Sequence, residues 1–151
     1  MTGELPDEPG VYALILRAKR RVNTQVGRFG RVELGPGVYV YVGSAKGPGG
    51  LKARISRHLR SWKRLRWHID YLLTAGLEVV AVAYLPSKSV TECDLVSALL
   101  EEGFTAPVRR LGATDCRRGC PAHFLASNAG IEETVERIRK ALVKLASRRE
   151  G

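Results

Sequence analysis

Arg54 and His58 are spaced one helical turn apart, in a segment whose pattern predicts a helix beginning at Leu51. On that helix the two side chains share one face and point to the same place. An apolar strand containing Tyr41 precedes the helix, and a glycine-rich turn separates the strand from it. A tyrosine hydroxyl, a guanidinium and an imidazole that meet beside such a turn are suited to hold a phosphodiester.

The chain has a large excess of positive charge, with 25 Lys and Arg residues against 15 Asp and Glu and a net charge of +10. Such an excess attracts polyanions over a Debye length of about 8 Å, so nucleic acid is the expected partner. Trp62 and Trp67 lie among the basic residues and could either stack on bases or pack in the core. The candidate nucleic-acid contacts are Lys52, Arg57, Arg60, Lys63, Arg64, Arg66, Arg20 and Arg21.

The elements that must position these groups fit one domain over residues 1–151. Apolar runs predict strands over 10–16, 38–42 and 77–85, with a basic hairpin insertion over about 17–36. Helices are expected over 51–66 and 67–73, from a cap at Ser89 or Thr91 to Gly103, and over about 131–148, whereas 104–130 is expected to be mostly loop. This order predicts an α+β fold, in which a small mixed or antiparallel central sheet is flanked by helices.

The sequence also bears on location. It contains no run of about 18 apolar residues, and its first residues lack the basic-then-apolar order of a signal peptide. We therefore expect a cytoplasmic protein without a membrane partner. Asn occurs only at 23 and 128, Gln only at 25 and Met only at 1, a scarcity of heat-labile residues that is typical of thermophilic sources.

Five features in fixed order carry a resemblance: Gly10-Val11-Tyr12, Tyr41-Val42-Gly43, Arg54, His58 and Glu92. Together they resemble the GIY-YIG nuclease superfamily over about residues 9–125. The segments His68-Ile69-Asp70-Tyr71 and Thr91-Glu92-Cys93, with the late Cys and His cluster, resemble an uncharacterised archaeal branch of it. Members of that branch are sometimes fused to endonuclease III-type DNA glycosylases.

The resemblance implies a metal-dependent endonuclease that hydrolyses phosphodiester bonds in DNA more than in RNA, with a DNA-repair protein as a candidate partner. Arg54 would bind phosphate, and Glu92 would be the protein ligand of one Mg²⁺ or Mn²⁺ ion. Tyr12 or Tyr41 would orient or deprotonate water, and the choice between them stays open. Two further residues, Lys46 and His58, would assist them.

Taken singly, these residues have simpler interpretations. Tyr12 and Tyr41 fit core aromatics, Arg54 and His58 fit a solvated basic helix, and Glu92 fits the first turn of a helix. The competing hypothesis is a non-catalytic nucleic-acid-binding module of the same fold. A third is a structural subunit of a repair assembly.

A second candidate site lies late in the chain, where Cys116, Cys120 and His123 offer three soft ligands. A zinc site normally needs a fourth ligand, which His68 or Asp115 could supply. A disulfide between Cys116 and Cys120 is the second interpretation, and reduced thiols without metal are the third and favoured one. Cys93 is expected to be buried on its helix.

Overall fold

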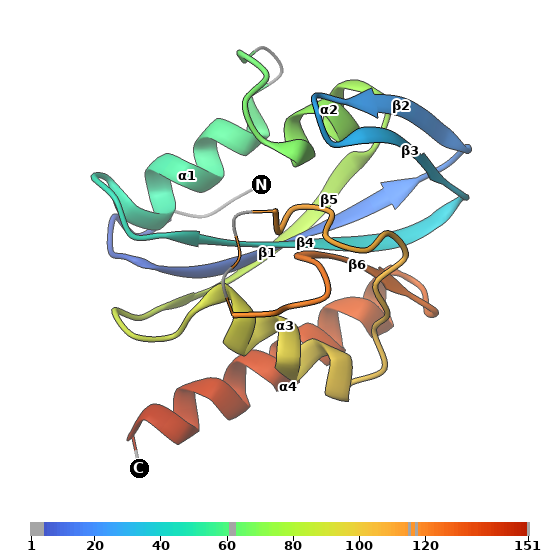
Figure 1. Cartoon of the computed structure of the whole chain (residues 1–151). Coiled ribbons are helices and arrows are strands. Elements are labelled where there is room, and N and C mark those ends of the chain that lie inside the picture. The colour runs from blue at the N-terminus through green and yellow to red at the C-terminus, as the bar shows by residue number, and fades with distance from the viewer. Residues whose placement is uncertain (1–4, 61–62, 115, 117, 151) are drawn as a thin grey trace.

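The computed structural model describes residues 5–60, 63–114, 116 and 118–150. At its centre lies a four-stranded antiparallel sheet with the strand order β5-β1-β4-β6 (Figure 1). The predicted α+β class is confirmed. The strands of this sheet are β1 (Gly10–Ala18), β4 (Gly37–Ala45), β5 (Glu78–Pro86) and β6 (Phe124–Ser127).

A separate two-stranded sheet lies within the segment between β1 and β4. It is an antiparallel hairpin formed by β2 (Val22–Val26) and β3 (Gly30–Leu34). Its alternating buried valines pack into the core on one side, whereas an ion pair between Arg21 and Glu33 (3.1 Å) lies at the surface. The charged residues of β3, Arg31 and Glu33, are likewise exposed and lie away from the core.

Two helical layers cover the two faces of the central sheet (Figure 1). One layer contains α1 (Gly50–Leu59) and α2 (His68–Thr74) together with the hairpin, and the other contains α3 (Glu92–Glu101) and α4 (Ile131–Glu150). Side chains alternate along β1: Val11 packs toward α3 and α4, and Tyr12 packs toward α1. Both faces of β1 are thus buried, which explains its unbroken apolar sequence.

The basic helix is shorter than predicted. The sequence pattern indicated a helix through residue 66, but α1 ends at Leu59 and Arg60 is extended. The Lys63 ammonium donates to the carbonyls of His58 (3.0 Å) and Arg60 (2.6 Å), so it satisfies carbonyls that the ended helix leaves open. Trp62 lies outside the described residues.

A short strand in the predicted loop region was missed. β6 pairs with β4 from Val38↔Ser127 to Tyr41↔Phe124, and so forms an edge of the central sheet. Four residues are too few for a periodic pattern, so only the pairing with β4 identifies this strand. The helix cap at Thr91 is confirmed, because its hydroxyl accepts from the Asp94 amide at 3.2 Å.

Candidate active site and cysteine–histidine group

The pairing of β1 with β4 places the two tyrosines on one face of the sheet. Tyr12 is opposite Gly43 and Leu14 is opposite Tyr41, so the tyrosine rings are diagonal neighbours with centroids 6.5 Å apart. A Cβ atom at Gly43 would overlap the Tyr12 ring. Because Gly43 has no side chain, it leaves the space in which the Tyr12 ring lies.

The start of α1 brings Arg54 and His58 over the same face. At Gly50, which has φ +56°, a Cβ atom would overlap the carbonyl oxygens of Asp7 and Glu8. The same N-terminal segment accepts a hydrogen bond from the Leu51 amide, through the Glu8 carbonyl (2.8 Å). This close backbone contact sets the position of α1 against the sheet.

His58 forms a buried pair with Tyr12. Its Nε2 lies 2.6 Å from the Tyr12 hydroxyl, the two residues are 2% and 1% exposed, and its Nδ1 is buried without a partner. Burial lowers the pKa of His58 to about 3, against the opposing charge of Asp70. Burial, and next the neighbouring Tyr41, raises the pKa of Tyr12 well above its ordinary value. At neutral pH both groups are therefore uncharged.

Tyr41, by contrast, lines a pocket of about 460 Å³. β6 pairs with β4 only as far as Tyr41, and the pocket lies beside the part of β4 that follows. Gly43 and Ser44 of that part line the pocket. Arg54 reaches it from α1 and Glu92 from the first turn of α3. Tyr41, Arg54 and Glu92 are far apart in the sequence but line one cavity. This is the arrangement that a shared site requires.

The charges around this pocket act on the Tyr41 hydroxyl. Burial raises its pKa, the negative charge of Glu92 raises it further, and the positive charge of Arg54 opposes both. The Arg54 guanidinium donates to the Ser44 carbonyl at 3.0 Å, which holds it at the pocket wall. Among the described residues, no basic group lies within ion-pair distance of the Glu92 carboxylate.

Lys46 does not line this pocket in the structure. Its ammonium donates to the carbonyls of Ser87 (3.0 Å) and Val90 (2.9 Å), which lie in the connection between β5 and α3. These bonds hold the segment that leads to Glu92. The contacts of Lys46 are therefore structural.

Arg57 and Trp67 are likewise held by neighbours. Arg57 donates two 3.0 Å bonds to the carboxylate of Asp70, whose side chain is fully buried, and its guanidinium lies 4.1 Å from the centre of the Trp67 ring. Arg54 contacts the same ring at 4.6 Å. Several of the other candidate nucleic-acid contacts are exposed on and after α1 and before β2: Lys52, Arg60, Arg64, Arg66, Arg20 and Arg21.

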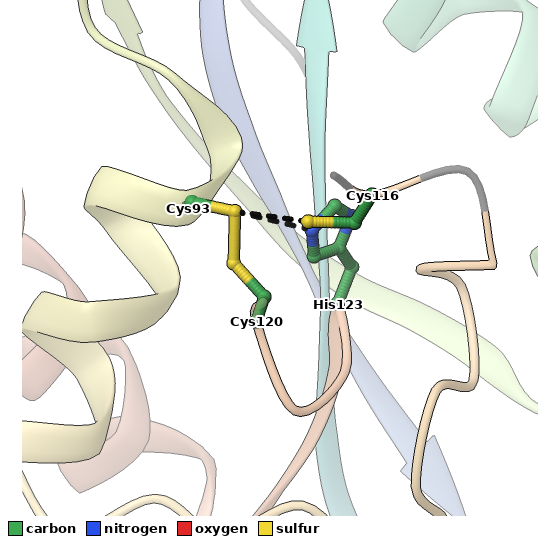
Figure 2. Close-up of side chains that lie close together, drawn as sticks. All are labelled: Cys93, Cys116, Cys120 and His123. Carbon is green, nitrogen blue, oxygen red and sulfur yellow. Dashed lines mark hydrogen bonds between the residues drawn. A yellow bond between two sulfur atoms is a disulfide. The ribbon is translucent and has the colours of Figure 1, made fainter. Parts of the chain in front are cut away.

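A second cluster borders the same pocket. Cys93 on α3 lies beside three residues of the segment before β6 (Figure 2), and we call the four the Cys–His group: Cys93, Cys116, Cys120 and His123. Their ligand atoms all lie within 4.8 Å of one another, so the group could hold a metal ion. In the structure Cys93 and Cys120 form a disulfide, and Cys116 Sγ lies 3.2 Å from Cys93 Sγ.

The sequence-based account of this cluster is corrected in two respects. The disulfide joins Cys93 to Cys120, whereas the sequence suggested Cys116 and Cys120. The fourth candidate metal ligand is Cys93, whereas the sequence suggested His68 or Asp115. The Nδ1 of His68 instead accepts from the Gly112 amide at 2.8 Å. Asp115 lies outside the described residues. Cys93 was missed because only the packing of α3 brings it beside the late cysteines.

Residues 11–146 match the model of a domain of unknown function, DUF123. The chain belongs to this family. The matched residues of the chain include Tyr12, Tyr41, Arg54, Glu92 and the Cys–His group. Neither the curated proteins nor the solved structures contain a significant match.

In the part of the chain that the structure describes, no helix combines the length and the apolar character needed to cross a membrane.

Proposed function

We propose that this DUF123 domain is a metal-dependent endonuclease that hydrolyses phosphodiester bonds, in DNA more than in RNA. The observation that carries the proposal is the meeting of Tyr41, Arg54 and Glu92 in one pocket, although they come from β4, α1 and α3. The resemblance to GIY-YIG nucleases names the same residues from their order in the sequence. The pocket lies beside a basic surface, which favours a polyanionic substrate.

Arg54 and Glu92 have complementary roles in this proposal. The planar guanidinium of Arg54 would bind the scissile phosphate and offset the charge that develops on it. The Glu92 carboxylate, which has no basic partner among the described residues, would hold one Mg²⁺ or Mn²⁺ ion. When bound, such an ion would polarise the phosphate and help the leaving oxygen depart. The soft donors of the Cys–His group suit zinc better than magnesium, so we assign them a different ion.

Of the two tyrosines, we assign the water-orienting role to Tyr41. It lines the pocket, whereas Tyr12 is buried and bonded to His58. The Tyr41 pKa is raised partly by the charge of Glu92, so cation binding at Glu92 would remove part of that obstacle to proton transfer. We assign Tyr12 and His58 a positioning role, since their bonded pair packs behind the Tyr41 ring.

The decisive test is cleavage of labelled single-stranded, duplex, flapped and branched DNA and RNA, with Mg²⁺, with Mn²⁺ or with a chelator. Glu92→Ala and Arg54→Ala are compared with two controls outside the pocket, Glu101→Ala at the end of α3 and Arg139→Ala on α4. We expect metal-dependent cleavage that drops by at least about a hundredfold in the first two variants and is retained in the controls.

Binding recorded in the same samples separates the proposal from its main competitor. Binding without cleavage, with Glu92→Ala unchanged, would identify a non-catalytic nucleic-acid-binding module. The proposed cytoplasmic location and a DNA-repair partner agree with either outcome, so they are tested separately by fractionation and co-purification.

A further inference from the structure

We propose that the Cys–His group is a structural zinc site, in which three thiolates and one imidazole complete the four positions around one Zn²⁺ ion. The inference is independent of the proposed nuclease activity. It rests on four soft ligand atoms that come from two distant segments of the chain and lie within 4.8 Å of one another. The donor chemistry, three sulfurs and one nitrogen, is one that structural zinc sites use.

The separations fit a tetrahedral ion. Zinc binds sulfur at about 2.3 Å and histidine nitrogen at about 2.0 Å, so neighbouring ligand atoms in a tetrahedral site lie roughly 3.5–3.8 Å apart. The Cys93 sulfur lies 3.2 Å from the Cys116 sulfur and 3.8 Å from His123 Nε2. The sulfurs of Cys93 and Cys120 are bonded to each other, so they can take up this spacing only after reduction lets their side chains rotate apart.

The backbone holds the ligands near these positions. The amide of Cys116 donates to Ala113 (3.0 Å), and the amide of His123 donates to Leu111 (3.0 Å). The carbonyl of His123 accepts from Val42 of β4 at 2.8 Å, which ties the ligand segment to the central sheet.

Burial indicates a closed, structural site. Cys93, Cys120 and His123 are 9%, 8% and 7% exposed, and Cys116 is half-buried. Four protein ligands leave no open position for water or substrate, which distinguishes structural from catalytic zinc. Three thiolates would leave the bound group with one net negative charge, and the positive charge of Arg118, which lines the same pocket, would offset it.

The disulfide in the structure is the oxidised, metal-free state of the same residues (Figure 2). Only thiolates bind the metal, so a reductant must first supply two electrons to the Cys93–Cys120 bond. The two protons come from the reductant when it is a thiol, and from water when it is a phosphine that is oxidised to its oxide. The three thiols then lose their protons as Zn²⁺ binds. A disulfide between Cys93 and Cys120 does not explain why Cys116 and His123 lie close to Cys93. A zinc site uses all four residues.

The position of the ion would link two walls of the pocket. Cys93 is adjacent to Glu92 in the first turn of α3, and the other ligands belong to the segment that ends at β6. Zinc would therefore hold the N-terminus of α3 against that segment. It would thereby also fix the distance between Glu92 and Tyr41.

The test is a Co²⁺ titration of the full chain, reduced with a phosphine and freed of metal by a chelator. Tetrahedral thiolate coordination gives intense visible bands and a sulfur-to-cobalt charge-transfer band. We expect these to saturate at one ion per chain and to vanish when Zn²⁺ is added. Cys116→Ser should reduce the charge-transfer band by about a third, because one of three thiolates is lost. His68→Gln, a histidine outside the group, should leave it unchanged.

Thiol reactivity in the unmodified chain gives a second readout that needs no variant. We expect the three thiols to react slowly in the zinc-loaded protein and rapidly once a chelator removes the ion. Octahedral cobalt spectra, less than one ion per reduced chain, or equal thiol reactivity with and without zinc would overturn the proposal. None of these measurements depends on nuclease activity, so failure of one proposal is distinguishable from failure of the other.

Discussion

The Tyr12 hydroxyl and the Nε2 of His58 lie 2.6 Å apart in a site where both residues are almost fully buried. The partners come from β1 and α1, so the bond joins the central sheet to the helix that carries Arg54. Because the second nitrogen of His58 is buried without a partner, protonating the ring would place an uncompensated charge in the core.

This pair predicts a pH-dependent stability. The pKa of His58 is about 3 in the folded chain and about 6.5 when unfolded, so between these values the unfolded chain binds one more proton. Stability should therefore fall by about 1.4 kcal/mol per pH unit as the pH drops through that window, and His58 should contribute no slope above it. Urea unfolding between about pH 7 and pH 5 measures this.

The comparison variant is His58→Gln, which keeps a hydrogen-bonding group beside Tyr12 but does not titrate. Its stability should depend less steeply on pH than that of the unmodified chain. His123, whose pKa burial also lowers, should leave a residual slope in both proteins. Equal slopes in the two proteins would show that His58 does not remain neutral in the fold.

Gly43→Ala should destabilise the protein by about 1–3 kcal/mol, because the added methyl group overlaps the Tyr12 ring and forces it to move. Gly35→Ala is the matched control, since nothing lies within 4 Å of a Cβ atom there. Thermal or urea unfolding of the two variants measures the difference. Similar stabilities would mean that the Tyr12 ring has room to shift.

Asp70→Asn should cost about 3–5 kcal/mol, because it leaves the partly buried Arg57 guanidinium without its ionised partner. The pKa of Asp70 is lowered, with hydrogen bonds from Arg57 and from the Trp67 and Arg66 amides outweighing burial, so the native pair is charged at neutral pH. Glu133→Gln breaks an exposed pair with Arg137 and should cost less than about 0.5 kcal/mol. Urea unfolding would contradict the prediction if both variants lost the same small amount.

Binding to nucleic acid should weaken with salt, and replacing Arg60 or Arg64 by Ala should reduce the slope of log affinity against log salt by about 1 each. Both arginines are exposed beside α1, whereas the control Arg139 lies on the opposite face, on α4. Fluorescence anisotropy over a series of salt concentrations measures the slopes. A slope that Arg139→Ala lowers as much as the other two would assign binding to net charge instead of to this surface.

The order of five features, through the resemblance they carry, named Tyr41, Arg54 and Glu92 as candidate site residues. The sequence by itself also determined the α+β class and most of the strands and helices. These follow from local patterns: the unbroken apolar run of β1, the helical periodicity of α4, and the tripeptides that mark the ends of β1 and β4. Each pattern reflects which side chains a strand or helix buries, and neighbouring residues are enough to reveal it.

Only the tertiary structure decided which residues belong together across long separations. The pairing register of β1 and β4 buries Tyr12 and leaves Tyr41 in the pocket, and the packing of α3 brings Cys93 to the late cysteines and His123. The existence of β6 also depends on contacts with distant residues, because it pairs with β4. A local pattern cannot encode such contacts, because their energy depends on partners that are distant in the sequence.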